Sequence, residues 1–394
     1  MNETIYMPVG EVCSSISDTY REKKNMVTLI NTSDVLEGRV LNHERVPNSN
    51  LKGQFKKTFQ RDDILYSEIR PQNRRFAYVD FSPIDYIAST KLMVIRAKKD
   101  VVSPKYLYYF LKNSSTVAEL QLLAETRSGT FPQITFSEVA NLTIPVPPLA
   151  VQEVIVQTMQ CLEDKTICNE QINDNLEQQA QAIYHERFET ASPDDLHSGW
   201  RTVTLGEVAT ILNKSFNPLK EPEMLLEHYS IPAFDEARFP VFDLSTSIKS
   251  NKFIIDASCF MISKLNPTTK RVWKPYCLTG NAVCSTEFIV YKAKDKTITD
   301  FLYSVIDSNS FSDFMCSHVT GSTGSRQRTT PSDTLSYELI LPSEDELAEF
   351  QSLVSPMYAQ MRINAIENDK LKRLRDSLLP KLMSGEIDVS SVHL

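Results

Sequence analysis

The sequence lacks the long apolar runs that would mark a membrane or secreted protein. No apolar run approaches the roughly 20 residues that a transmembrane helix needs. The N-terminal segment has no basic stretch followed by an apolar one, which argues against secretion. The seven cysteines, odd in number and without framework spacing, fit a reducing compartment. We therefore expect a cytoplasmic protein.

The sequence also lacks every catalytic or metal-binding pattern for which we searched. There is no C-x-x-C pair, no ligand-spaced pair among the six histidines, no phosphate loop, no dinucleotide-binding G-x-G-x-x-G and no H-E-x-x-H. The tetrapeptide Asn-Pro-Pro-Tyr/Phe, with which amino-methyltransferases hold a flipped base, is absent too. We predict no catalytic residue, no metal and no cofactor on this chain. It is not expected to be an enzyme, so any catalysis must come from partners.

Acidic charge is concentrated in one segment of the chain. The formal net charge is −8, but residues 1–150 carry +3 and residues 151–199 carry −8. Residues 200–345 carry −2 and residues 346–394 carry −1. The two large parts of the chain are therefore near neutral, and the total does not exclude nucleic-acid binding.

An internal repeat runs through the whole sequence at an offset of 196 residues. Gly10-Glu11-Val12 recurs as Gly206-Glu207-Val208, and Arg74-Arg75 falls on Lys270-Arg271. After a slip of one residue, Gly129 aligns with Gly324, and Asn169 and Asn173 align with Asn364 and Asn368. Such a register indicates a tandem duplication. Two unrelated α+β domains with coincidental dipeptides are the weaker alternative.

Each copy has the alternating patterns of an α+β unit. Strands and loops lead to a short amphipathic helix, expected over 104–123 and 298–315, and then to a last strand at 142–146 or 337–341. A long helix follows Pro147-Pro148 in the first copy. In the second copy Ser343 and Glu346 form a capping box at the helix start. The predicted segments are 1–147, 148–197, 198–342 and 343–394.

The two long helices carry apolar residues at spacings of three and four, as in a coiled coil. Each seam is interrupted by two asparagines, Asn169 with Asn173 and Asn364 with Asn368. We expect the helices to pair antiparallel with these polar stretches in contact, which would fix their register and give the chain pseudo-twofold symmetry. About 40 residues make a rod of roughly 60 Å, a spacer between the two units. The alternative is that each helix packs on its own sheet with the asparagines solvated.

Basic and polar residues recur in loops that correspond between the copies. Arginine suits guanine or phosphate, and lysine mainly contacts phosphate. Glycine, serine and threonine near them allow the backbone to approach phosphates. For each single residue, a solvated surface charge is the competing interpretation. The predicted DNA contacts are Lys56, Lys57, Arg70, Arg74, Arg75, Arg127 and Gln133 in the first copy, and Lys264, Lys270, Arg271, Lys274, Arg326, Gln327 and Arg328 in the second.

Three segments carry a resemblance to a known family. They are the strand–Pro-Pro–helix junction at 141–155, the helix end Leu371-Lys-Arg-Leu-Arg-Asp-Ser-Leu-Leu-Pro-Lys-Leu-Met-Ser-Gly-Glu-Ile387, and the opening at 199–209. They resemble the specificity subunit of type I restriction–modification enzymes across essentially the whole chain. The first helix departs from the pattern with Val151-Gln152-Glu153, and the second copy lacks the Pro-Pro run.

The resemblance implies two target recognition domains, each of which recognises one half of a split, asymmetric DNA sequence. It implies that the helices set the unread gap and dock two modification (methyltransferase) subunits, joined by two restriction (motor-nuclease) subunits. S-adenosylmethionine and ATP with magnesium would be bound by those partners. The rival hypothesis is a two-module coiled-coil scaffold that binds proteins and not DNA.

Overall fold

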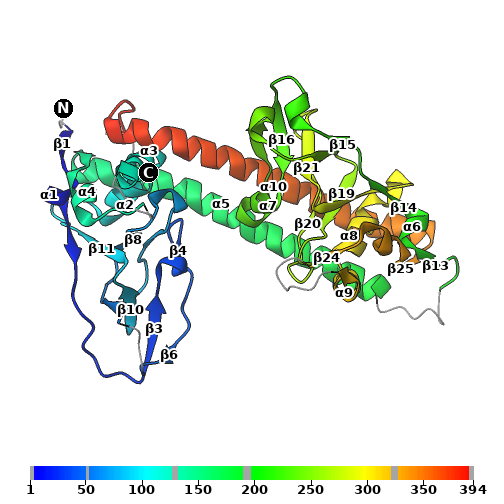
Figure 1. Cartoon of the computed structure of the whole chain (residues 1–394), viewed down its shortest axis with the longest axis horizontal. Coiled ribbons are helices and arrows are strands. Elements are labelled where there is room, and N and C mark those ends of the chain that lie inside the picture. The colour runs from blue at the N-terminus through cyan, green and yellow to red at the C-terminus, as the bar shows by residue number, and fades with distance from the viewer. Residues whose placement is uncertain (1–3, 50–52, 127–131, 190–196, 321–326, 390–394) are drawn as a thin grey trace. The chain divides into compact units, whose positions relative to one another are not determined.

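The computed structural model describes residues 4–49, 53–126, 132–189, 197–320 and 327–389 (Figure 1). The chain divides into two compact units. Unit 1 is Met1–Lys165 with Lys370–Leu394, and unit 2 is Thr166–Asp369. Each unit therefore combines one sheet-rich domain with a segment of both long helices, α5 (Leu149–Tyr184) and α10 (Glu344–Ser384).

The first domain contains two four-stranded sheets, with strand orders β2-β11-β8-β9 and β6-β3-β10-β7. Strands β3 and β10 lie side by side and run parallel, with Thr28 beside Tyr86 (Figure 1). The strands are β1 (Ile5–Pro8), β2 (Cys13–Ile16), β3 (Met26–Ile30), β4 (Val35–Leu36), β5 (Arg39–Val40), β6 (Val46–Pro47), β7 (Phe55–Lys57), β8 (Ile64–Ser67), β9 (Phe76–Tyr78), β10 (Tyr86–Ser89), β11 (Leu92–Ala97) and β12 (Thr143–Val146). The helices are α1 (Val9–Val12), η1 (Thr32–Asp34), η2 (Pro71–Asn73), α2 (Pro104–Lys112), α3 (Ser114–Thr126) and α4 (Phe136–Asn141).

The second domain has sheets with the orders β14-β22-β19-β20 and β15-β18-β21-β16-β17. Its strands are β13 (Arg201–Thr204), β14 (Ala209–Leu212), β15 (Ser215–Phe216), β16 (Leu225–Tyr229), β17 (Val241–Leu244), β18 (Lys252–Ile254), β19 (Cys259–Ser263), β20 (Val272–Trp273), β21 (Ala282–Ser285), β22 (Phe288–Ala293), β23 (Val319–Thr320), β24 (Arg328–Thr329) and β25 (Glu338–Leu341). Its helices are α6 (Leu205–Val208), η4 (Pro218–Lys220), α7 (Ile231–Ala237), η5 (Ser245–Ser247), η6 (Lys296–Ile298), α8 (Thr299–Ile306), α9 (Asn309–Ser317) and η7 (Pro331–Ser336), and a π-helical turn, η3 (His185–Glu189), ends α5.

The predicted duplication is confirmed strand by strand. The order β2-β11-β8-β9 recurs as β14-β22-β19-β20, and the terminal pair β1–β12 recurs as β13–β25. The parallel pair β3–β10 recurs as β16–β21. The second copy has an additional edge strand, β15, in its second sheet and a two-stranded sheet β23–β24, whereas the first copy has a two-stranded sheet β4–β5.

The prediction of one short amphipathic helix in each copy is wrong, because each is two helices. In the first domain α2 ends at Lys112, the next residue Asn113 has a backbone that is not helical, and α3 begins at Ser114. In the second domain Ser308 separates α8 from α9, and its hydroxyl accepts the amide of Phe311. Serine and asparagine hydrogen-bond the backbone locally and so favour caps over helix interiors. Hydrophobic spacing alone does not show such a break.

Both long helices contribute to the core of each domain. In unit 1, Ile155 of α5 and Leu382 of α10 are buried in the same cluster as Leu107 of α2. In unit 2, Ala180 of α5 and Phe350 of α10 are buried in the second domain's cluster. The helices therefore pack on the sheets as well as on each other. Among the described helices, none is long and apolar enough to cross a membrane.

The predicted antiparallel pairing of the helices is confirmed within unit 2. Asn169 donates to Asn368 at 2.8 Å, and Asn364 donates to Asn173 at 2.9 Å. Because the repeat equates Asn169 with Asn364 and Asn173 with Asn368, these two hydrogen bonds are one contact made twice. Asn169 and Asn364 are 1% and 3% exposed, so the alternative of solvated asparagines fails at these two positions. Their shared burial resists any slip of one helix along the other.

Candidate DNA interface

In each domain the structure joins the two loops that the sequence singled out. In the first domain Ile69 and Gln133 form an isolated antiparallel bridge, and the Arg70 amide donates to the carbonyl of Pro132 at 3.1 Å. In the second domain Leu265 and Arg328 form the corresponding bridge. The segments 68–75 and 132–134, and likewise 264–274 and 327–329, therefore make one surface in each copy.

One backbone position of this surface is left-handed in both copies. Arg70 has a φ of 45° and Asn266 a φ of 48°, and each precedes a proline. The repeat places Arg70 on Asn266. Left-handed backbone in a non-glycine residue costs of order 1–3 kcal/mol, and the hydrogen bonds to the neighbouring loop offset this cost. The Asn266 amide donates to the carbonyl of Gln327 at 2.9 Å.

The two arginines after Arg70 are tied to the first domain mainly by neutral groups. Arg74 donates to the hydroxyl of Ser114 at 2.8 Å, and its nearest carboxylate, that of Glu37, lies 3.8 Å away. Arg75 donates to the carbonyl of Ser33 at 3.0 Å. Carbonyls and hydroxyls orient a guanidinium without cancelling its charge. This part of the surface therefore stays positive.

The corresponding cations of the second domain have carboxylate partners. Lys270 lies 3.0 Å from Asp307, and Lys274 pairs with Asp300. Arg271 makes a bidentate pair with Asp235, and only 14% of its side chain is exposed. Burial raises the pKa of Asp307 to about 6, against the opposing effect of Lys270. These three cations stabilise the domain and contribute less positive potential than the sequence suggested.

Arg328 has a carboxylate partner but stays exposed. Its Nε donates to Glu287 Oε2 at 3.0 Å and its Nη2 donates to Oε1 at 3.1 Å. These hydrogen bonds raise the pKa of Arg328. The side chain is 42% exposed. The guanidinium is thus held in place at the surface, whereas that of Arg271 is largely covered.

The remaining predicted contacts differ in how accessible they are. Lys56 is exposed, whereas the Lys57 ammonium donates to the carbonyls of Thr90 and Leu92, and burial lowers its pKa. Lys264 is half-buried next to Glu287, to whose carbonyl its amide donates. Arg127 and Arg326 lie outside the described residues. Contact with DNA stays a prediction for the whole set.

A loop of the second domain is held by two buried side chains. The Glu227 carboxylate, 0% exposed, accepts the amides of Leu278 and Thr279 at 3.0 and 2.8 Å. It also accepts the hydroxyl of Tyr229 at 2.5 Å. That hydroxyl in turn accepts the amides of Tyr276 and Cys277. Four consecutive amides of the loop therefore donate to these two buried side chains. These hydrogen bonds fix the backbone conformation in which the loop tip faces solvent.

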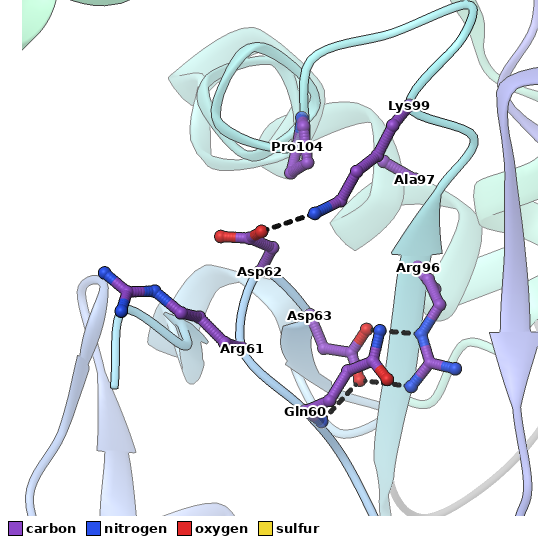
Figure 2. Close-up of a pocket in the computed structure, with 8 residues that line it drawn as sticks. All are labelled: Gln60, Arg61, Asp62, Asp63, Arg96, Ala97, Lys99 and Pro104. Carbon is purple, nitrogen blue, oxygen red and sulfur yellow. Dashed lines mark hydrogen bonds and ion pairs between the residues drawn. The ribbon is translucent and has the colours of Figure 1, made fainter. Parts of the chain in front are cut away.

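One cavity of the first domain is lined by internal ion pairs. It has a volume of about 240 Å³ and lies between the turn before β8 and the end of β11 (Figure 2). Arg96 makes a bidentate pair with the buried Asp63, with both distances 2.7 Å, and Lys99 lies 2.6 Å from Asp62. Arg61 extends away from both pairs (Figure 2). Lys292, the counterpart of Arg96, pairs with Asp256 in the second copy. In both copies an ion pair therefore links this turn to the neighbouring strand.

No catalytic arrangement emerges from the described part of the chain. There, no group of three or more histidine, cysteine or acidic side chains could hold a metal ion. The buried carboxylates described above are each engaged with a cation or with backbone amides. The surface formed by the joined loops therefore remains the candidate functional site.

The family model described as "Type I restriction modification DNA specificity domain" matches residues 6–178. The HindI type I restriction enzyme specificity subunit of Haemophilus influenzae is 28% identical, over 92% of this chain and 94% of that protein. The chain is therefore similar to type I restriction–modification specificity subunits along most of its length. The MjaIX specificity subunit of Methanocaldococcus jannaschii is 24% identical, over 79% of this chain and 77% of that protein. The alternative of a scaffold that does not bind DNA receives no support.

Solved structures of specificity subunits share the fold. The S subunit from M. genitalium superposes with a TM-score of 0.53 and 15% identity, over 97% of this chain and 96% of that one. A chain from work on complex assembly and conformational transition of a type I R-M system superposes with a TM-score of 0.51 and 18% identity, over 98% of both chains. The chain thus shares with these structures a fold that contains two sheet-rich domains and long helices.

Two residues of the surface formed by the joined loops were missed by the sequence analysis. Asn266 shares the left-handed position of Arg70, and Glu287 holds Arg328. The repeat itself contained the signal, because it places Asn266 on Arg70 and Glu287 on Lys91. The predicted set was limited to basic residues and glutamines, so Asn266 and Glu287 were left out of it.

Proposed function

We propose that the chain is the non-catalytic specificity subunit of a type I restriction–modification complex. Each sheet-rich domain recognises one half of a split, asymmetric DNA sequence, and the paired helices set the unread gap. The helices dock two modification subunits, and two restriction subunits join for cleavage in the cytoplasm. S-adenosylmethionine, ATP and magnesium are bound by these partners and not by this chain.

One observation carries the proposal. The same two loops meet at the same bridge in both domains, but the side chains at the matched positions differ: Arg70 and Gln133 in one, Asn266 and Arg328 in the other. Arginine pairs with guanine, and asparagine or glutamine pairs with adenine, through two hydrogen bonds in the major groove. The two domains therefore share the backbone arrangement of these loops but differ in the side chains that could contact bases, as expected of two domains that recognise different sequences.

The test is the salt dependence of DNA affinity, measured for the chain assembled with its modification subunits. We expect the logarithm of the association constant to fall linearly with the logarithm of salt concentration. The slope should be about −0.9 for each phosphate that is neutralised. An affinity that does not change with salt would contradict DNA binding. It would favour a protein-binding scaffold instead.

Replacing Arg326 and Arg328 together by alanine should weaken or relax recognition at one half-site only. The reason is that Arg328 belongs to the second domain, whose two loops form a bridge of their own. The recognised motif, determined by sequencing of selected DNA or of methylated host DNA, would show which half changes. Equal loss at both halves would contradict independent recognition by two domains.

A further inference from the structure

The ion pair between Glu287 and Arg328 combines two features: it is bidentate, and its arginine is exposed. A surface salt bridge contributes little stability, about 0–1 kcal/mol, so stability alone does not explain a bidentate geometry at an exposed position. Arg328 is also held by its backbone on both sides, through Thr320 of β23 and the bridge to Leu265. The result is an arginine that is both fixed and 42% exposed.

The geometry of the pair leaves one edge of the guanidinium available. Glu287 takes the Nε hydrogen and one Nη2 hydrogen of Arg328. Three of the five donors remain, two on Nη1 and one on Nη2. One hydrogen of Nη1 and one of Nη2 lie along the second edge of the planar group, and the other Nη1 hydrogen points toward Cδ. Two parallel N–H donors at such an edge match the O6 and N7 acceptors that guanine presents in the major groove.

The charge of the pair favours a base over a phosphate as its partner. The carboxylate of Glu287 neutralises Arg328, so the pair adds little to the attraction for the DNA backbone. A carboxylate close to phosphates is itself unfavourable. Arginine that serves phosphate binding gains nothing from such a partner, whereas arginine that serves base recognition gains orientation, since less side-chain freedom is lost on binding.

The first copy supports this assignment by contrast. At the matched positions it has Lys91 in place of Glu287 and Gln133 in place of Arg328. Lys91 lies 3.6 Å from Glu68, whose own counterpart is Lys264. Both copies therefore have a carboxylate next to the bridge, but that of Glu68 pairs with a lysine, whereas that of Glu287 pairs with the bridge arginine itself. Both members of the pair changed together between the two domains.

Resting on the proposed function, we propose that Glu287 is a positioning residue that holds Arg328 to recognise a guanine in the half-site of the second domain. Glu287 does not itself contact DNA. Its carboxylate selects one orientation of the guanidinium before DNA arrives. Gln133 occupies the same point in the first domain without such a support.

The experiment selects bound DNA from a randomised double-stranded library, using the chain assembled with its modification subunits. The unmodified chain should show a motif with a guanine at one base pair of the second domain's half-site. Glu287→Ala should reduce that preference by about tenfold, within the roughly 5- to 150-fold discrimination of a bidentate contact. Preferences at all other positions should persist. Glu287→Gln, which keeps one acceptor, should restore part of the preference.

Two further measurements separate positioning from charge and from folding. Arg328→Gln, which removes the charge, should lose the same guanine preference while the slope of affinity against salt stays unchanged, because a residue that contacts only a base neutralises no phosphate. A slope that falls in magnitude by about 0.9 would mean a phosphate contact and would overturn the proposal. Asp256→Ala, which removes the exposed partner of Lys292 in the same domain, is the matched control and should leave the motif intact. The thermal midpoint should be similar in all these variants.

An unchanged motif in Glu287→Ala would also overturn the proposal, since positioning would then be unnecessary. Loss of preference at every position of the half-site, with a lowered thermal midpoint, would assign Glu287 a structural role instead and reject it as well. Failure of the proposed function looks different. In that case the unmodified chain itself would select no motif.

Discussion

Replacing Glu227 by alanine is expected to lower the free energy of unfolding of unit 2 by about 3–5 kcal/mol. The substitution leaves the amides of Leu278 and Thr279 without their acceptor in a site that is 0% exposed. It also removes the acceptor of the Tyr229 hydroxyl. For a unit of this size, the loss corresponds to a fall of about 6–20 °C in the melting temperature. Calorimetry of the full chain would measure it.

The matched control is Glu223→Ala, because Glu223 is exposed in the loop just before β16. It should change the melting temperature little. Hydrogen exchange gives a local test, since the amides of Leu278 and Thr279 should exchange much faster in Glu227→Ala. Equal stability and equal exchange in both variants would contradict the role assigned to this carboxylate.

Removing one matched heptad from each long helix is expected to shorten the unread gap by about three base pairs. The segments are Asp164–Glu170 of α5 and Glu367–Arg373 of α10. Seven helical residues span about 10 Å, and base pairs rise about 3.4 Å each. The double deletion retains the Asn173–Asn364 contact and the approach of Glu163 to Arg375. Motif determination with the assembled complex would report the gap.

Both half-sites should stay unchanged in that variant, because no residue of either sheet-rich domain is removed. Deleting only the α5 segment is the control. It brings Glu163 and Asn173 seven residues closer together along α5, while the spacing of their partners Arg375 and Asn364 along α10 stays the same. The Asn173–Asn364 and Glu163–Arg375 contacts can then no longer form together. That variant should lose sequence-specific binding. A gap of the original length in the double deletion would contradict the idea that the helices measure it.

The sequence was sufficient to predict the duplication, the helix pairing and the correspondence of the loops, because all three depend on periodicity. A repeat of 196 residues carries the strand order from one copy to the other. Two asparagines in each apolar seam indicate contact, since an isolated polar residue in such a seam needs a partner. These inferences needed only positions along the chain and the chemistry of single residue types.

The partners of the charged side chains could not be predicted in the same way. Asp235 precedes Arg271 by 36 residues, and Glu287 precedes Arg328 by 41. Pairs so distant in sequence are set by the way strands and loops meet, which local patterns do not contain. For this reason the sequence analysis placed Lys57, Lys270 and Arg271 among the DNA contacts without showing that their side chains bind groups of their own domains. The breaks before Ser114 and after Ile306 depend likewise on local capping.

The division of the chain into units has a consequence for the order of synthesis. Unit 2 is one continuous segment, whereas unit 1 needs residues from both ends of the chain. Proteins emerge from the ribosome N-terminus first, so the second domain has all of its residues before the first does. Leu379 and Leu382, which complete the core of unit 1, are among the last to appear. A stop codon after Asp369 would therefore spare the second domain and leave the N-terminal one without part of its core.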